Sequence, residues 1–514
     1  MHAFLPRFAT AGVRLCRLLL QQPMQACRSP RSLASWSSSG SLAPLLRPIA
    51  RHSTTNRRPP QPTLDARTLN KMLSTQKSLA GLLSLHRARK TSMDGIHLAT
   101  TWSKLAKLNG HHREKRWLDK NEWRLVSLRE HTVEMMSQLH ARALANVTHS
   151  LVSAKLFGRP PWDEVLALLG DQTQGRLGEF NTQGLANTAW AFAKAEHSIA
   201  SLFDAIAAQA RGQLSKFKPQ ELANTAWAFA SVDHAAPGLF DLIAVEARGR
   251  LIDFNPQNLA NTAWAFATAQ QDAPDLFGAI DAEARWRLRE FTPQGLANTA
   301  WAFATAEHAA PGLFEEIATE ARGRIGEFKT QEMASMAWAF ATAEYAAPRL
   351  FEAIGAEAQD RLGDFNAQDL ANSAWAFAKA EHVSPSLFEA IAAGAAERLD
   401  EFNDQNLANM VWAFATVEHA VPYLFEAIAA EARGRLRKFS AQGLSNMAWA
   451  FATTKHTAPG LFEAIAAEAR GRLCEFKPQE LANTAWAFVT AEHVTPGLLE
   501  AGAEAPRRLC NFNL

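Results

Sequence analysis

Residues 254–267 read Phe-Asn-Pro-Gln-Asn-Leu-Ala-Asn-Thr-Ala-Trp-Ala-Phe-Ala, and close copies of this stretch recur along the 514-residue chain with a constant period of 37. The tryptophan marks the register of nine copies: Trp190, Trp227, Trp264, Trp301, Trp338, Trp375, Trp412, Trp449 and Trp486. A fixed period of this size is typical of stacked supersecondary units. We therefore predict a repeat protein with a long continuous surface, whose ligand is a polymer or a partner protein.

The first half of each repeat reads as a helix. In the copy quoted above, Asn255 is a favourable N-cap and Pro256 suits the first helical position. The run that follows is rich in alanine and contains no glycine, which favours helix. The side expected to be buried consists of Leu259, Ala263, Phe266 and Ala267, with Trp264 at its edge, and the opposite side consists of position 258, Asn261, Ala265 and position 268.

A second helix completes the repeat. Apolar residues follow helical spacing from Leu239 to Phe254, and Glu246 and Arg250 form an i,i+4 pair that we expect on the solvent side. A single hairpin of two such helices cannot bury both of its apolar faces, so neighbouring hairpins must stack. The sequence thus predicts an all-α protein, an α-solenoid superhelix of helix-turn-helix repeats, with about eleven hairpins of which two are degenerate.

Three segments are expected along the chain. Residues 1–63 hold nine arginines, no lysine and no acidic residue, with an amphipathic start, which indicates an organelle transit peptide; a disordered basic tail is the alternative. Residues 64–150 carry degenerate repeat motifs and are expected to cap the array, because terminal repeats expose one face. Residues 151–514 form the regular array, which ends directly after a shortened second helix, so that either its cap is minimal or the chain is truncated.

Charge is distributed unevenly between these segments. The chain has a net charge of +2, but residues 64–150 hold 15 basic and 7 acidic residues, whereas residues 151–514 hold 29 basic and 44 acidic residues. Nucleic-acid binders usually neutralise phosphates with lysine and arginine, so the acidic array argues against strong RNA affinity of purely electrostatic origin. Of the four cysteines, Cys16 and Cys27 lie in the expected presequence, and Cys474 and Cys510 occupy equivalent repeat positions, which suggests packing.

One candidate site is a row of asparagines at the same repeat position. Asparagine is not favoured inside a helix, so its repetition needs a reason. The row either forms a structural ladder with the backbone or the next repeat, or it presents amides to a ligand on the concave face. Its members are Asn187, Asn224, Asn261, Asn298, Asn372, Asn409, Asn446 and Asn483, with Ser335 in the remaining copy.

Positions that vary between near-identical repeats are the second candidate, because a modular reader of RNA would vary where it contacts its ligand. Drift at exposed positions is the alternative. The position three residues before each asparagine changes between copies and includes Glu221, Asn258 and Asn406. The position after the asparagine also changes, and we include Thr188, Thr225, Thr262 and Thr299 with the asparagine row as predicted RNA-binding residues.

Other chemistry is not expected. A row of histidines, which includes His197 and His234, falls at the ends of the first helices, where imidazole interacts favourably with exposed carbonyl groups. Stacked helices are ~8–10 Å apart, too far for successive imidazoles to share a metal ion. The sequence contains no nucleophile–base constellation, phosphate-binding loop or zinc-ligand spacing, so we expect neither an enzyme, nor a cofactor, nor a metal site. No apolar run is long enough to span a membrane.

Residues 217–230, Phe-Lys-Pro-Gln-Glu-Leu-Ala-Asn-Thr-Ala-Trp-Ala-Phe-Ala, resemble the octotricopeptide repeat family, whose units share a Pro-Gln-x-Leu-Ala-Asn-x-x-Trp-Ala core. The segment 69–108 resembles the N-terminal helical region of the related FAST-kinase-like and RAP-domain proteins. Together these resemblances cover roughly residues 65–514 and imply an α-solenoid that binds organellar RNA. The chain departs from them in its acidic array and in lacking a RAP-like domain at the C-terminus.

The leading hypothesis is a sequence-selective single-stranded RNA-binding protein of an organelle, which reads about one base per repeat and acts in RNA processing, mRNA stability or translation. The alternative is a protein-binding scaffold whose acidic solenoid surface suits basic or ribonucleoprotein partners. The expected location is the mitochondrial matrix, with the plastid stroma of a chloroplast as the alternative. Amides on the concave face with nearby lysine or arginine would favour RNA, and carboxylates on that face would favour a protein.

Overall fold

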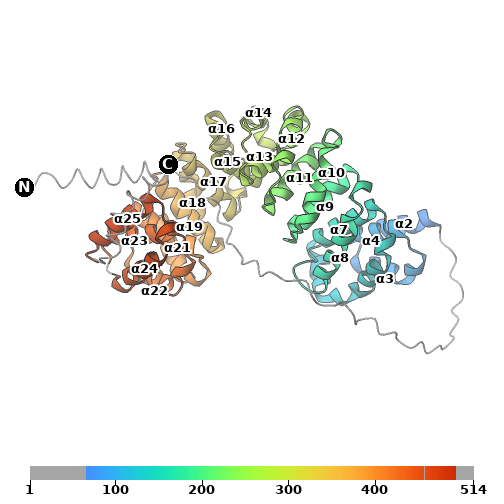
Figure 1. Cartoon of the computed structure of the whole chain (residues 1–514), viewed down its shortest axis with the longest axis horizontal. Helices are drawn as coiled ribbons and strands as arrows, with labels where there is room; N and C mark the ends of the chain where they lie inside the picture. The colour runs from blue at the N-terminus through green and yellow to red at the C-terminus, as the bar shows by residue number, and fades with distance from the viewer. Residues whose placement is uncertain (1–64, 457, 494–514) are drawn as a thin grey trace, which may run out of the picture. The chain divides into compact units, whose positions relative to one another are not determined.

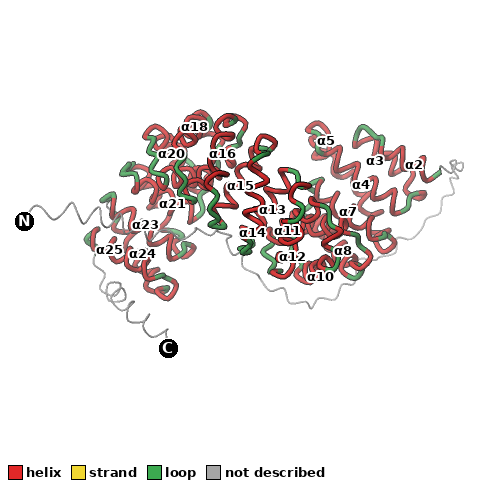
Figure 2. Tube along the Cα trace, turned by 90° about the horizontal axis from the view of Figure 1, so that it is seen from above, coloured by secondary structure: helices red, strands yellow, loops and turns green. Residues whose placement is uncertain are grey.

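Every element in the described part of the computed structural model, residues 65–456 and 458–493, is helical, and the predicted α-solenoid is confirmed (Figures 1 and 2). None of these helices is long and apolar enough to cross a bilayer. The expected transit peptide, the second helix of the last repeat and Cys510 lie outside the described residues. The described chain divides into two compact units, one that ends at Leu139 and one that begins at His140.

The larger unit is a stack of helical hairpins. Its first helices are α7 (Ala141–Ser153), α9 (Thr182–Lys194), α11 (Pro219–Ser231), α13 (Pro256–Thr268), α15 (Pro293–Thr305), α17 (Thr330–Thr342), α19 (Ala367–Lys379), α21 (Asp404–Thr416), α23 (Ala441–Thr453) and α25 (Pro478–Thr490). Its second helices are α8 (Trp162–Gln174), α10 (Ala200–Arg211), α12 (Pro237–Arg248), α14 (Pro274–Arg285), α16 (Pro311–Gly323), α18 (Pro348–Asp360), α20 (Pro385–Ala396), α22 (Pro422–Arg433) and α24 (Pro459–Gly471).

A short 3-10 turn joins each hairpin to the next, and proline at the first helical position fixes where most helices begin. These turns are η4 (Leu177–Glu179), η5 (Leu214–Lys216), η6 (Leu251–Asp253), η7 (Leu288–Glu290), η8 (Ile325–Glu327), η9 (Leu362–Asp364), η10 (Leu399–Glu401), η11 (Leu436–Lys438) and η12 (Leu473–Glu475). The array therefore begins with α7, ten residues before the boundary that the motifs indicate. His149 of α7 takes the place of the repeat tryptophan, and its ring centroid lies 4.8 Å from that of Trp190.

The first and second helices form two layers (Figure 1). Neighbouring first helices pack extensively along their length, whereas neighbouring second helices touch each other much less. The hairpins consequently fan out on the side of the second helices, and the first helices form the inner layer. Between the layers, aromatic rings meet edge to face, as between Phe277 and Phe303, whose centroids are 5.1 Å apart.

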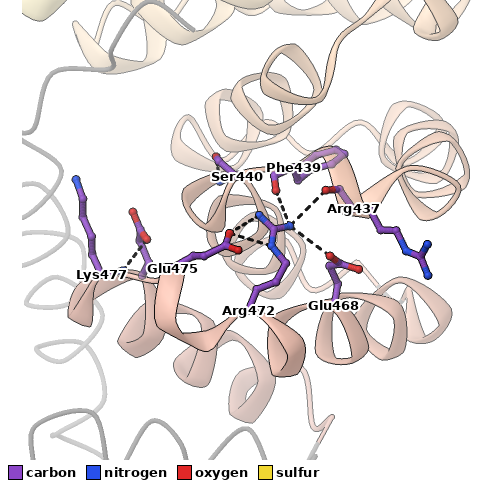
Figure 3. Close-up of polar contacts among 9 residues, drawn as sticks. Arg437, Phe439, Ser440, Glu468, Arg472, Glu475 and Lys477 are labelled. Carbon is purple, nitrogen blue, oxygen red and sulfur yellow. Dashed lines mark hydrogen bonds and ion pairs between the residues drawn. The ribbon is translucent and has the colours of Figure 1, made fainter. Parts of the chain in front are cut away.

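The recurrent Glu–Arg pair ties successive repeats together instead of lying fully in solvent. In Figure 3, the Arg472 guanidinium donates hydrogen bonds to Glu468 at 3.3 Å and Glu475 at 2.7 Å, and also to the carbonyl oxygen of Phe439 at 2.9 Å. The same contact to a phenylalanine carbonyl 33 residues earlier is made by Arg287, Arg324, Arg361, Arg398 and Arg435. Charged hydrogen bonds of this kind are among the stronger ones in proteins, so they fix the register between hairpins.

The smaller unit comprises the described residues 65–139. Its elements are α2 (Ala66–Ser74), α3 (Leu79–Arg89), η1 (Lys90–Ser92), α4 (Gly95–Asn109), α5 (His112–Asn121), η2 (Glu122–Leu125), α6 (Val126–Met135) and η3 (Met136–Gln138). Its core is partly polar. The Trp102 indole donates to the Thr132 hydroxyl at 2.9 Å, and the buried His86 and His131 imidazoles share a hydrogen bond of 3.0 Å.

This histidine pair makes the smaller unit sensitive to acid. Burial, reinforced by His131 and Lys90, lowers the pKa of His86 to about 4, whereas an unfolded histidine titrates near 6.5. As the pH falls below 6.5, His86 becomes protonated in the unfolded state but stays neutral in the folded state. The free energy of unfolding of the smaller unit therefore decreases progressively from its value at pH 7. We expect a loss of about 2 kcal/mol at pH 5. Hydrogen-exchange protection of α3 and α6 at pH 7 and 5 measures it, and His86→Leu should reduce the difference.

Candidate nucleic-acid interface

Most first helices leave the same four repeat positions fully or partly exposed, whereas Trp338, Asn409 and Trp412 are buried. In α13 the four positions are Gln257, Asn261, Trp264 and Thr268, whose spacing of four, three and four residues places them on one side of the helix. We call the equivalent residues of all first helices the inner stripe. Asn258, Thr262 and Ala265 are buried, at 6%, 0% and 0% exposure. The exposed side is thus rotated by about one residue from the predicted one, because each first helix is covered by its hairpin partner and by two neighbouring first helices.

Glutamine and tryptophan belong to the stripe but are absent from the RNA-binding residues predicted from the sequence. The glutamine is invariant: Gln183, Gln220, Gln257, Gln294, Gln331, Gln368, Gln405, Gln442 and Gln479. The fourth position is threonine or serine except for Lys194 and Lys379. Invariance of glutamine and tryptophan was visible in the sequence, but it did not reveal that most of these side chains are at least partly exposed.

The tryptophans form a continuous ladder along the middle of the stripe. Centroid separations from Trp227 to Trp412 are 6.2, 6.3, 6.2, 6.3 and 6.1 Å for successive pairs, with the rings tilted by about 30°. Most of these indoles are half-buried, and Trp486 at the end of the described array is exposed. The ladder therefore offers a ligand a strip of aromatic surface flanked on one side by asparagine and glutamine.

The asparagine row lies on this stripe and does not form a structural ladder. Asn409 is buried, at 3% exposure, and we withdraw it from the interface. The half-buried members are Asn187, Asn224, Asn261, Asn298, Asn372, Asn446 and Asn483. Among the described residues, the side chains of all the half-buried members except Asn483 make no hydrogen bond, and their polar atoms are accessible to solvent. These amides are therefore available to an external ligand.

The predicted residues Glu221, Asn258 and Asn406 are buried, and each takes part in N-terminal capping through its side chain or its backbone N–H, so we withdraw them from the interface. They occupy the third position of their helices, and their identity follows the N-cap. A lysine N-cap is paired with glutamate, which accepts from the lysine backbone N–H, in Lys218–Glu221, Lys329–Glu332 and Lys477–Glu480. Where the N-cap residue is Asn, Thr or Ser, its side-chain oxygen accepts from the backbone N–H of the third residue. These pairs are Asn181–Gly184, Asn255–Asn258, Thr292–Gly295, Asn366–Asp369, Asn403–Asn406 and Ser440–Gly443.

Thr188, Thr225, Thr262 and Thr299 are also withdrawn, because they pack between first helices with at most 1% exposure. The Thr225 and Thr299 hydroxyls donate to the carbonyl oxygens of Glu221 and Gly295, each at 2.8 Å. Methionine replaces threonine at this position in three copies, as a buried packing site permits. Variation between repeats therefore reflects capping and packing, and the exposed stripe is the nearly constant part.

The capping relation gives a direct test. We expect Glu221→Gly to lower the free energy of unfolding by about 1–2 kcal/mol, because Lys218 supplies no side-chain acceptor of its own. Lys218→Asn should restore most of this loss in the double variant, since it recreates the Asn–Gly combination of α9. Urea denaturation of the four chains measures the coupling; additive effects of the two substitutions would contradict it.

The charges around the stripe are strongly asymmetric. Of its members in α9 to α25, only Lys194 and Lys379 carry a charge. An exposed acidic row follows the C-terminal ends of the first helices: Glu196, Asp233, Glu307, Glu344, Glu381, Glu418 and Glu492. All seven have positive φ, between 51° and 56°, which is costly for residues other than glycine. Lys379 pairs with Glu344 at 2.8 Å, which shows that this acidic row borders the stripe.

Comparison with known proteins places the chain in a family. A family model described as RNA-editing substrate-binding complex 6 protein matches residues 163–382 and 228–495, and the second match alone spans more than half of the chain. The chain belongs to this family. The description associates the family with RNA, which agrees with the coarser prediction of an RNA-associated helical-repeat protein. It does not name octotricopeptide repeats, so that finer assignment stays a prediction.

Other comparisons add little. No curated protein matches the chain. A similar solved structure is titled "Homology model of the full-length AP-3 complex in an intermediate open conformation", with 8% sequence identity, 87% of this chain and 86% of that chain covered, and a TM-score of 0.24. A TM-score this low carries no argument about fold or function.

Proposed function

We propose that the chain binds single-stranded RNA along the inner stripe. The observation that carries this proposal is a set of six unpaired asparagine amides on the same stripe as the tryptophan ladder: Asn187, Asn224, Asn261, Asn298, Asn372 and Asn446. Amides hydrogen-bond to the edges of bases, and aromatic rings give bases a surface to contact. Both interactions require bases that are not paired in a duplex. Family membership supports RNA as the ligand.

The stripe also bears on selectivity. A code that reads different bases needs different side chains in successive repeats, and the stripe presents glutamine, asparagine and tryptophan almost without change. We therefore propose one similar contact per repeat, with little discrimination between RNA sequences, in place of the sequence-selective reading of the leading hypothesis. Departures from the pattern, such as Ser335, Lys194 and Lys379, are the places where selectivity could enter.

The biological setting follows from the same reasoning. We propose a role in RNA processing within an organelle, for which the composition of residues 1–63 favours the mitochondrial matrix over the plastid stroma. RNA editing is the form of processing that the family's description names. The same RNA-binding activity could also affect mRNA stability or translation. A fluorescent fusion of residues 1–70 tests the location, and a fusion that stays in the cytosol would contradict it.

The acidic row favours a second candidate function, the binding of a basic protein segment. Acidic residues at helix C-termini oppose the helix dipole, and positive φ adds backbone strain, so local stability does not explain their recurrence. A basic partner could occupy this edge while RNA occupies the stripe. The protein-scaffold hypothesis thus remains as a companion to RNA binding, located on different residues.

The test is equilibrium binding of the full chain to fluorescent 30-nucleotide RNAs. We expect oligo(U), oligo(A) and a mixed sequence to bind within about tenfold of one another, and a perfect duplex to bind more weakly. Absence of binding to every single strand would contradict the proposed function. Tight binding to the mixed sequence alone would contradict only the lack of base selectivity.

A further inference from the structure

The smaller unit carries a basic face on helix α5. Helix α5 carries Arg113, Arg116 and Lys120, whose spacing of three and four residues aligns them on one side, and all three side chains are exposed. Leu118 is buried on the opposite side of the helix. Arg124 follows in η2. We call these four cations with Trp117 and Trp123 the α5 face.

Three of the four cations of the α5 face form no ion pair within the described fold. Within the described residues, Arg113, Arg116 and Lys120 make no ion pair, and the nearby Glu114 carboxylate is already engaged by the Leu79 backbone N–H at 2.7 Å. The recurrent arginines of the array are different, since Arg287, Arg324 and their equivalents donate to glutamates and to phenylalanine carbonyls. Helix α5 therefore carries three unpaired positive charges on one side, whereas the inner stripe is almost neutral.

Aromatic side chains accompany this charge. The Arg124 guanidinium lies over both indoles, 5.7 Å from the Trp117 centroid and 5.0 Å from the Trp123 centroid. Trp123 remains 61% exposed, so it has surface left for a further contact. Surfaces that bind single-stranded nucleic acid combine two components: cations that contact the phosphate backbone, and aromatic rings on which bases stack.

We propose that the α5 face is a second RNA contact, in which Arg113, Arg116 and Lys120 bind phosphates and Trp123 stacks on a base. Taking RNA as the ligand rests on the proposed function, but the residues and the unit are different. An anionic membrane is the competing ligand. It is disfavoured because the exposed side of α5 is polar and offers no aliphatic surface for insertion among lipid chains. The α5 face would supply the electrostatic attraction that the stripe lacks.

The test uses the full chain with Arg113→Gln, Arg116→Gln and Lys120→Gln combined, titrated with 30-nucleotide RNA between 50 and 300 mM salt. Loss of three phosphate contacts should reduce the slope of log affinity against log salt by about 2 and weaken binding on the order of 100-fold at 0.1 M salt. Trp123→Ala should weaken binding roughly 5- to 150-fold and leave the slope unchanged.

A matched control removes the same charge elsewhere on this unit, through Arg67→Gln, Lys71→Gln and Lys77→Gln, all of them exposed residues. We expect its slope and affinity to stay close to those of the unaltered chain. An unchanged slope in the α5 variant, or an equal change in the control, would overturn the proposal. The proposal would also be overturned if the α5 variant lost binding to phosphatidylserine vesicles but kept its RNA affinity, because the α5 face would then be a membrane-binding surface.

These outcomes are separable from failure of the proposed function. If the α5 variant loses RNA affinity while substitutions in the asparagine row do not, the α5 face stands as an RNA contact and the inner stripe does not. If the asparagine substitutions weaken binding while the α5 variant behaves as its control, the stripe stands and the α5 face fails.

Discussion

RNA affinity should fall by roughly 2–6 kcal/mol when Asn224, Asn261, Asn298 and Asn372 are all changed to alanine, because each neutral hydrogen bond contributes about 0.5–1.5 kcal/mol. These amides have no partner among the described residues, so their removal leaves no group of the protein unpaired. Alanine is also the better helix former, and the melting temperature should hold or rise. Fluorescence anisotropy with oligo(U) and a thermal melt by circular dichroism measure the two quantities.

The neighbouring threonines provide the control. Thr225→Val, Thr262→Val and Thr299→Val alter the next residue of three of these helices, yet their side chains are buried between the helices. We expect this triple variant to keep its RNA affinity and to lose some stability, the reverse of the asparagine variant. Lowered stability with unchanged affinity in the asparagine variant would restore the structural-ladder interpretation.

The tryptophan ladder should contribute to both binding and stability. Changing Trp264 and Trp301 to alanine removes three successive ring contacts, from Trp227 through to Trp338. We expect affinity to fall by about 1–3 kcal/mol for each base that loses its aromatic surface. The melting temperature should also fall, since aromatic pairs contribute about 0.5–1.5 kcal/mol each beyond the area they bury.

An exposed tryptophan on the outer layer provides a control. It distinguishes the loss of a ligand contact from the general effect of removing an aromatic side chain. Trp286 follows α14 in the outer layer and is 90% exposed. Trp286→Ala should change neither affinity nor melting temperature appreciably. If the Trp264 and Trp301 substitutions lowered stability while affinity of the folded protein stayed the same, the ladder would be a packing device only.

The period of the repeat was sufficient to predict the architecture, and the reason lies in residues such as Asn255 and Pro256. A capping residue followed by proline fixes where a helix begins, and the structure starts α13 at Pro256 as expected. The exposed side of the helix was harder to predict. Helical periodicity assumes one buried face, but α13 is buried on three sides, and only the line through Asn261 and Trp264 remains open.

The candidate site was predicted in part for the same reason. The asparagine row was recognisable because asparagine is unfavourable inside a helix and its recurrence called for an explanation. The variable positions misled, since the sequence does not show that Glu221 caps its own helix beside Lys218. Likewise, the positive charge of residues 64–150 was visible in the sequence, but the lack of ion pairs at Arg113, Arg116 and Lys120 required the structure.

Ultraviolet crosslinking of the full chain to oligo(U), followed by mass spectrometry of the crosslinked peptides, tests the central claim most directly. The inner stripe predicts crosslinks at the tryptophan positions of several first helices, above all in α11, α13, α15 and α19, where the neighbouring asparagines are open to solvent. Crosslinks confined to the second helices, such as α12 and α14, would contradict RNA binding by the inner stripe.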